Sequence, residues 1–282
     1  MRGGAQAHLI EADDGYTYVV KFLNNPQGHR ILTNEFIASQ LMQAMALSTP
    51  VIALITLPDR PLDGAALHAN GRNEPAAAGV HFGSRRPGPL ATCTVYDFLP
   101  DAILPEVLNR EEFLGALVFD KWLSNADSRQ AIFYKAHITG SGVECDALAH
   151  WVTQFIDNGL QFQGEDWCFR DSPVQGLYGR ASVYADAGTL HQFDRWFEAL
   201  FALKRELIQD IIESLPVAWV VGERSQLAKT MKVLFSRREG IPGRIAESLL
   251  YLELQKHKRA FGGAQPFCRL TTLSRPKNPD YR

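Results

Sequence analysis

The spacing of apolar residues changes along the chain, and this change restricts the fold more than any other feature of the sequence. In the first hundred residues, short runs of β-branched and aromatic residues predict strands, as in TYVVKFL at residues 17–23. Later in the chain, apolar residues recur at helical spacing, as in Phe193, Trp196, Phe197 and Leu200. Strands followed by helices predict an α+β fold, with two lobes and a cleft between them.

The boundary between the lobes is expected near residue 98. Residues 1–98 would form a small, β-rich N-lobe, and residues 99–282 a helical C-lobe. Residues 260–282 are expected to be a disordered tail, because from Lys256 onward the chain carries seven Lys or Arg against one Asp and ends in a Pro-rich run.

Local patterns predict the individual elements. Asp13-Asp14-Gly15 is a hairpin turn signal, and Thr33 is a candidate helix N-cap. The N-lobe is predicted to contain strands at His8–Ala12 and Thr17–Leu23, a helix at Thr33–Leu47, a buried strand at Val51–Leu57, a loop over 58–90 and a strand at Thr92–Phe98. The C-lobe is predicted to contain a helix at Asn109–Ser124, strands at Ala131–Lys135 and Trp151–Ile156, and helices over 188–214, 223–236 and 240–256.

Composition excludes several classes of protein. The 282 residues are 46% hydrophobic and 21% charged with a net charge of −2, which fits a globular protein and makes a nucleic-acid partner unexpected. The sequence shows neither a secretory signal nor an apolar run of membrane length, so we expect a cytoplasmic location and no membrane partner. The cysteines lack metal-ligand spacing, and reduced thiols are expected at Cys93, Cys145, Cys168 and Cys268.

Lys21 is the first candidate functional residue. It ends the apolar run VVK, where a buried ammonium would need an anionic partner, and Glu35 in the next predicted helix is a candidate for that partner. In kinase-type phosphoryl-transfer sites, a strand lysine contacts the ATP phosphates and a helix glutamate holds the lysine. The ordinary alternative is an edge-strand lysine that faces water.

Two aspartates complete the candidate site. Asp127, in the polar run SNADSRQ, can accept the proton of an attacking hydroxyl group, and its alternative is a surface turn. Asp157 follows an apolar strand and precedes Asn158-Gly159, which presents a carboxylate to Mg²⁺, and its alternative is an Asx turn. The opening GGAQ places glycines where backbone N–H groups could approach phosphates, or is an unstructured terminus. These features occur along the chain in the same order as in kinases: glycine loop, strand lysine, helix glutamate and then the two aspartates.

Four stretches carry a resemblance to a known family, namely GGAQAHLIEADDGYTYVVKFLNNPQGHRILTNEFIA, YDFLP, VFDKWLSNADSRQAIF and FIDNGLQF. They resemble the bacterial HipA-like kinases, more specifically the shorter group that is largely the kinase core. The resemblance implies a protein-kinase-like fold and a kinase that transfers the γ-phosphoryl group of ATP to a hydroxyl acceptor. The acceptor is expected to be a protein serine or threonine of unknown identity, and a small polar molecule is the alternative.

The resemblance also implies a role for each residue. Lys21 would contact the phosphates, Glu35 would pair with it, Asp127 would be the base or the substrate orienter, and Asp157 would hold Mg²⁺. ATP would be bound by the glycine loop and by the connector between the lobes, the latter through its backbone. These residues are Gly3, Gly4, Ala5 and Gln6 in the loop, and Tyr96, Asp97 and Phe98 in the connector.

One position departs from the family pattern. Related kinases usually carry a metal-binding asparagine five positions after the catalytic aspartate, and here that position is Ile132, which cannot coordinate a cation. Gln130 takes the metal-ligand role if the loop is shorter, with Asn125 and Asn158 as weaker substitutes. Two alternatives therefore stay open: a pseudokinase that binds nucleotide without turnover, and an unrelated α+β domain.

Overall fold

The computed structural model describes residues 6–59, 66–69, 72–139 and 142–261. Small antiparallel sheets and helices make up this part of the chain, which confirms the mixed α+β class. The strands are β1 (His8–Glu11), β2 (Thr17–Lys21), β3 (Ile52–Leu57), β4 (Ala66–Ala69), β5 (Arg72–Pro75), β6 (Gly79–Arg85), β7 (Gln130–Thr139), β8 (Gly142–Cys145) and β9 (His150–Ile156). The α-helices are α1 (Arg30–Ala44), α2 (Glu112–Leu123), α3 (Asp194–Ala202), α4 (Arg205–Glu213), α5 (Arg224–Ser236) and α6 (Ile241–Phe261).

The first sheet has the order β1-β2-β6-β3, and all of its pairs are antiparallel. The prediction of a loop over 58–90 is wrong, because that stretch contains β4, β5 and the internal strand β6. The glycines of β6 made this strand look like a loop in the sequence. The sheet nevertheless requires glycine at position 83, because a Cβ there would lie 2.6 Å from Cγ1 of Ile55. The prediction that Val51–Leu57 is buried is also wrong, because β3 is an edge strand and Leu54 is 43% exposed.

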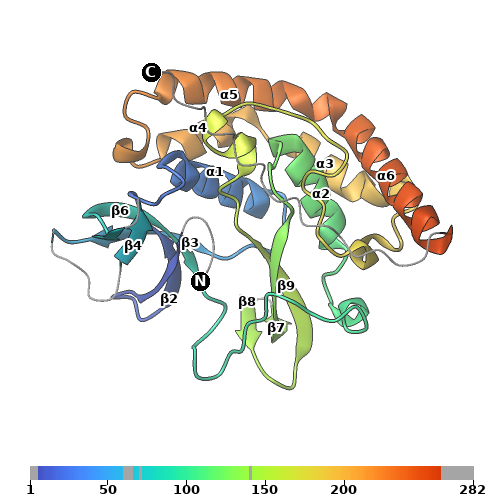
Figure 1. Ribbon diagram of the computed structural model, residues 1–282, viewed down its shortest axis with the longest axis horizontal. Coiled ribbons are helices and arrows are strands. Elements are labelled where there is room, and N and C mark those ends of the chain that lie inside the picture. The colour runs from blue at the N-terminus through green and yellow to red at the C-terminus, as the bar shows by residue number, and fades with distance from the viewer. Residues whose placement is uncertain (1–5, 60–65, 70–71, 140–141, 262–282) are drawn as a thin grey trace, which may run out of the picture.

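Helix α1 lies between the first sheet and the helices of the later chain (Figure 1). It contacts β6, α4 and the 3₁₀ turn at Gln161–Asp166. The helix begins at Arg30, so the prediction of Thr33 as its N-cap is wrong: Thr33 is fully buried inside the helix. The early start adds three residues, less than one helical turn, and brings Ile31 and Leu32 into the interior.

A large apolar core joins α1 to the later helices. Leu32, Ile37 and Leu41 of α1 share this core with Phe82 of β6 and with the buried faces of α2 to α6. A smaller cluster joins apolar residues in and next to the strands of the first sheet to Leu67 of β4, and it consists of Tyr18, Val20, Phe22, Ile55, Leu57 and Leu67. The sheet is tied to the helices by an indole, because the Nε1–H of Trp219 donates to the carbonyl oxygen of Val80 at 2.8 Å.

Strands β4 and β5 form a two-stranded sheet, and the third sheet has the order β8-β7-β9. Phe133 of β7 and Phe155 of β9 project from one face and pack on Phe113 of α2, with ring centroids 6.4 and 5.1 Å away. The prediction of a strand at Thr92–Phe98 is wrong except at Tyr96, which forms an isolated bridge with Phe133. The sheet positions the two polar runs of the candidate site, since one precedes β7 and the other follows β9.

The main difference between the C-terminal helices and their prediction lies in residues 188–214. The expected helix over 188–214 is divided into α3 and α4, because Leu203 and Lys204 adopt extended backbone angles. Helices α5 and α6 agree with prediction, although α6 continues to Phe261 and so includes the start of the expected tail. Residues 262–282 lie outside the described residues. Across the described ranges, no helix combines the length and the apolar character needed to cross a bilayer.

A disulfide joins Cys93 to Cys145, so the expectation of reduced thiols is wrong for this pair. The two residues are 52 positions apart, and they meet because Tyr96 bridges to β7 while β8 pairs with the same strand. Cys168 is a free thiol, and Cys268 lies outside the described residues.

Removing this disulfide is expected to destabilise the protein by about 2–4 kcal/mol, because the cross-link restricts the unfolded chain. The measurement is urea unfolding of the Cys93→Ser, Cys145→Ser double variant under non-reducing conditions. Cys168→Ser is the matched control, since it removes a thiol but no cross-link. If the double variant unfolds at the same urea concentration as the control, the disulfide does not stabilise the fold.

Candidate active site

Lys21 lies at the centre of a buried ionic cluster. It is the last residue of β2, and its side chain is only 11% exposed. Its ammonium donates to Oε1 of Glu35 in α1 and to Oδ1 of Asp157 after β9, the latter at 2.7 Å. The structure therefore brings together three residues that the sequence analysis singled out, and the edge-strand alternative for Lys21 does not hold.

The charges in this cluster shift one another's proton affinities. Burial by itself lowers the pKa of Lys21, but the negative charges of Glu35 and Asp157 outweigh it and raise the pKa above its ordinary value. Burial raises the pKa of Glu35 despite the nearby ammonium. Burial opposes ionisation of Asp157 too, yet the charge of Lys21 keeps the pKa of this carboxyl below its ordinary value. At neutral pH the ammonium is charged and Asp157 is ionised.

Asp157 stands in a turn with left-handed backbone geometry, at a φ of 62°. The turn is held from α1: the backbone N–H of Asn158 donates to Glu35, and the side chain of Asn158 reaches Oγ of Ser39 at 3.3 Å. The Asp157 side chain is 37% exposed, far more than its two partners. The turn thus presents one carboxylate of the cluster to solvent.

Asp127 is exposed in the loop between α2 and β7. Its backbone N–H donates to Oδ1 of Asn125 at 3.1 Å, and its own Oδ1 accepts from the backbone N–H of Ser128 at 2.7 Å. The Nε2 of Gln130 lies 3.4 Å from Oδ2 of Asp127. These contacts shape the loop and leave the aspartate side chain accessible.

Arg129 is the residue of this region that the sequence analysis missed. It is fully buried and makes two hydrogen bonds to the equally buried Asp120, at 2.9 and 3.0 Å. It also donates to the carbonyl oxygen of Ile156 and to Oδ1 of Asn158, at 3.1 and 2.9 Å. Arg129 therefore joins the Asp127 loop to the Asp157 turn.

The possible metal ligands are oxygen donors around the end of β9. Gln130 pairs with Ile156, the residue before Asp157, whereas Ile132 pairs with Gln154, further down the strand. Among the described residues, Gln130 bonds Asp127 and Asp157 bonds Lys21, with no hydrogen bond between Gln130 and Asp157. In the described part of the chain, no three His, Cys, Asp or Glu side chains gather into a metal-binding group.

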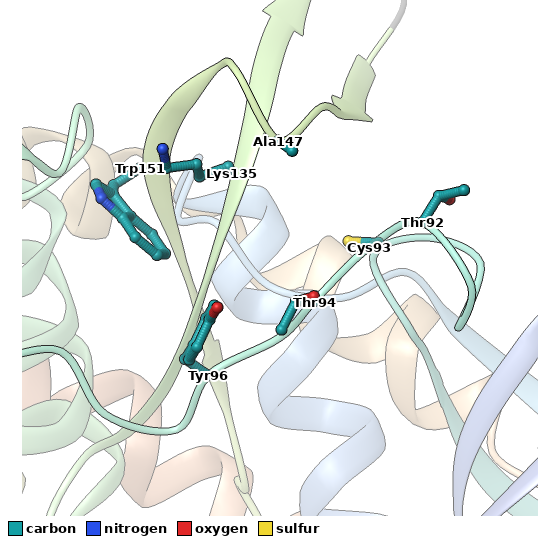
Figure 2. Close-up of a pocket in the computed structure, with 7 residues that line it drawn as sticks. All are labelled: Thr92, Cys93, Thr94, Tyr96, Lys135, Ala147 and Trp151. Atoms are coloured by element: carbon teal, nitrogen blue, oxygen red, sulfur yellow. The ribbon is translucent and has the colours of Figure 1, made fainter.

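Tyr96, the first residue of the connector, and the residues just before it border a cavity of about 340 Å³ with β7 and β9 (Figure 2). Tyr96 and Trp151 line it, with ring centroids 5.5 Å apart. Lys135 also lines it and lies five residues along β7 from Gln130, about 17 Å at the strand's rise per residue. The cavity is therefore separate from the place where Lys21 and Asp157 meet.

The predicted nucleotide contacts are only partly covered by the structure. Both the N–H and the C=O of Tyr96 are hydrogen-bonded to Phe133, so its main chain is occupied. Asp97 and Phe98 are exposed. The side chain of Gln6 is hydrogen-bonded to the backbone of His68. Its Nε2 donates to the carbonyl oxygen at 2.7 Å, and its Oε1 accepts from the backbone N–H at 2.6 Å. Gly3, Gly4 and Ala5 lie outside the described residues.

Comparison with protein families matches residues 1–133 to the family described as HipA-like kinase. The chain resembles the HipA-like kinases. The HipA-like match confirms the resemblance expected from the motifs, and it makes this a kinase-like protein. It covers just under half of the chain, includes Lys21, Glu35 and Asp127, and ends before Asp157.

Among solved structures, the crystal structure of a Helicobacter pylori proinflammatory kinase, CtkA, is similar to this chain, with 13% sequence identity. The alignment covers 90% of this chain and 93% of that one, with a TM-score of 0.45. No curated protein matches the chain.

Proposed function

We propose that this protein is a two-lobed, ATP- and Mg²⁺-dependent kinase that transfers the γ-phosphoryl group to a hydroxyl acceptor, a serine or threonine of a protein. The observation that carries the proposal is the meeting of Lys21 with Glu35 and Asp157, which are 14 and 136 positions away in the sequence. The HipA-like match over residues 1–133 supports it.

In this proposal Lys21 binds the phosphates of ATP. Its raised pKa keeps the ammonium charged throughout the physiological pH range. Glu35, 3% exposed and bonded to Lys21, fixes the direction of the ammonium. Positioning and electrostatic stabilisation of this kind account for most of the catalysis in phosphoryl transfer.

The residues at the end of β9 fit a magnesium ion. Asp157 has a lowered pKa and a partly exposed carboxylate, and Gln130 offers an amide oxygen on the neighbouring strand. Carboxylate and amide oxygens are the ligands that Mg²⁺ takes from proteins. When bound with ATP, Mg²⁺ would neutralise charge on the phosphates.

Asp127 is the proposed base or orienter for the acceptor hydroxyl, because its carboxylate is exposed beside the strand that carries Gln130. Adenine would be contacted by the connector, through the backbone of Asp97 and Phe98, since the main chain of Tyr96 is paired with β7. The glycine loop, Gly3 to Gln6, would cover the phosphates.

The proposal is tested by thermal denaturation with ATP and Mg²⁺, followed by an assay of radiolabel transfer from ATP. A ligand that binds only the folded state stabilises it by about 2.7 kcal/mol at a hundred times its Kd, so the melting temperature should rise. Asp127→Asn should keep this rise and lower transfer by about 100-fold or more. Asp146→Asn is the matched control, because Asp146 is a turn aspartate bonded to His137 and Leu148, away from the cluster.

A second function is favoured by Ile132, which stands where related kinases carry a metal-binding asparagine. A pseudokinase would show the thermal shift without any transfer by the wild-type protein. Absence of a shift at millimolar ATP and Mg²⁺ would count against both nucleotide-binding functions.

A further inference from the structure

The side chain of Asn34 makes four hydrogen bonds to one short segment of the chain. Asn34 is fully buried in α1, directly before Glu35. Its Nδ2 lies 2.8, 3.1 and 2.9 Å from the carbonyl oxygens of Gly159, Gln161 and Gly164. Its Oδ1 accepts from Nε1 of Trp167 at 2.8 Å. One amide thus uses both its donor and its acceptor on residues 157–167, called here the post-acid segment.

The post-acid segment has an unfavourable backbone. Four of its non-glycine residues adopt left-handed angles, with φ of 62° at Asp157, 57° at Phe162, 61° at Gln163 and 46° at Trp167. Each such residue costs roughly 1–2 kcal/mol relative to a right-handed conformation. A conformation of this kind persists only where surrounding contacts fix it.

Those contacts come from one surface of α1. Glu35 accepts a hydrogen bond from the backbone N–H of Asn158. Asn34 donates to carbonyl oxygens later in the segment, beginning with that of Gly159. Gly159 lies so close to the helix that a Cβ on it would be 2.6 Å from Cγ2 of Ile31. Adjacent residues of α1 therefore hold Lys21 on one side and the post-acid segment on the other.

We propose that Asn34 is a positioning residue for the phosphoryl-transfer site. By holding the carbonyl groups of Gly159, Gln161 and Gly164, it keeps the carboxylate of Asp157 in place against Lys21 and Glu35, and it acts on the metal only through Asp157. The inference rests on the proposed kinase function, and it adds a residue to which the kinase motifs assign no role.

Asn34→Asp is the sharpest test variant. It preserves size and the acceptor for Trp167, but it places an oxygen where Nδ2 donates to three carbonyl groups. Trp167→Phe is a second variant, which keeps the amide of Asn34 but removes the indole donor and part of a buried ring. Asn109→Asp is the matched control: the Nδ2 of Asn109 lies 3.0, 3.1 and 3.0 Å from Ser48, Glu112 and Thr153, with no contact to the post-acid segment.

The readout is the Mg²⁺ dependence of ATP turnover in the full chain. Loss of a partner that orients a metal ligand typically weakens metal affinity by 10- to 100-fold, so the half-saturating Mg²⁺ concentration should rise by about that factor in Asn34→Asp. Trp167→Phe should shift it less, in the same direction, and remains informative if Asn34→Asp does not fold. Asn109→Asp should lower the melting temperature and leave the Mg²⁺ dependence unchanged. An unchanged Mg²⁺ dependence in both test variants, or an equal shift in the control, would overturn the proposal.

Hydrogen exchange separates this inference from the kinase proposal. If the wild-type protein neither binds nor turns over ATP, the proposed function fails, and exchange of the backbone amides of residues 157–167 decides the positioning role alone. Faster exchange there in Asn34→Asp than in Asn109→Asp supports it. Equal exchange in the two variants rejects it.

Discussion

Replacing Asp157 with asparagine is expected to lower phosphoryl transfer by about 100- to 1,000-fold, in line with the loss of one preorganised electrostatic group at a reacting centre. Asparagine keeps the size of the side chain and an oxygen that can accept from Lys21. It removes the negative charge, which is what a carboxylate offers to a divalent cation. The loss should therefore appear in turnover and in the Mg²⁺ dependence together.

The same substitution is expected to change stability little. The cluster holds one ammonium between two carboxylates, and the charge of Asp157 adds to burial in raising the pKa of Glu35. Removing one carboxylate relieves that repulsion while Lys21 keeps its buried partner. Turnover measures the expected loss of transfer in Asp157→Asn, and the melting temperature measures the expected small change in stability. Asp146→Asn is the control for both measurements. Transfer within tenfold of wild type would rule out the metal-ligand role of Asp157.

Replacing Arg129 with methionine is expected to destabilise the fold by about 3–5 kcal/mol, the usual result of removing one partner from a buried ion pair. Both side chains of the Arg129–Asp120 pair are 0% exposed. Methionine fills much of the space but leaves Asp120 buried without a counter-charge. It also leaves the carbonyl of Ile156 and the side chain of Asn158 without a donor.

The measurement is urea unfolding of Arg129→Met, Asp120→Asn and the double variant. The double variant should be less destabilised than the sum of the two single changes, because no unpaired charge remains in it. Arg195→Met is the matched control, since its pair with Glu111 is 62% and 65% exposed and such pairs contribute about 0–1 kcal/mol. Equal losses in Arg129→Met and Arg195→Met would contradict the prediction.

The sequence allowed the residues of the buried ionic cluster to be predicted, and not those that hold them in place. Lys21 could be found because an ammonium in an apolar strand demands a partner, and Glu35 and Asp157 followed from the order of the motifs. Arg129 and Asn34 give no comparable signal. A buried polar residue is recognised by partners that are far away in the sequence, and the chain alone does not show which carbonyl groups come near it.

The errors in the predicted fold have the same origin. Strand β6 was missed because Gly79 and Gly83 give it the composition of a loop, and its place inside the sheet depends on β2 and β3. The Cys93–Cys145 disulfide could not be expected from spacing, since the two residues meet only through the pairing of β7 with β8 and with Tyr96. The hairpin and the helices α2, α5 and α6 depend on local patterns and agree with prediction closely.

The burial of α1 has a consequence for how the protein can be divided. A fragment that ends at residue 98 would carry α1 without the helices that cover Leu32, Ile37 and Leu41. Those apolar side chains would lose part of their cover and meet water, which favours self-association over independent folding. The first hundred residues are therefore best regarded as part of one cooperative folding unit with the later helices. A fragment made by limited proteolysis or domain exchange should keep α1 together with those helices.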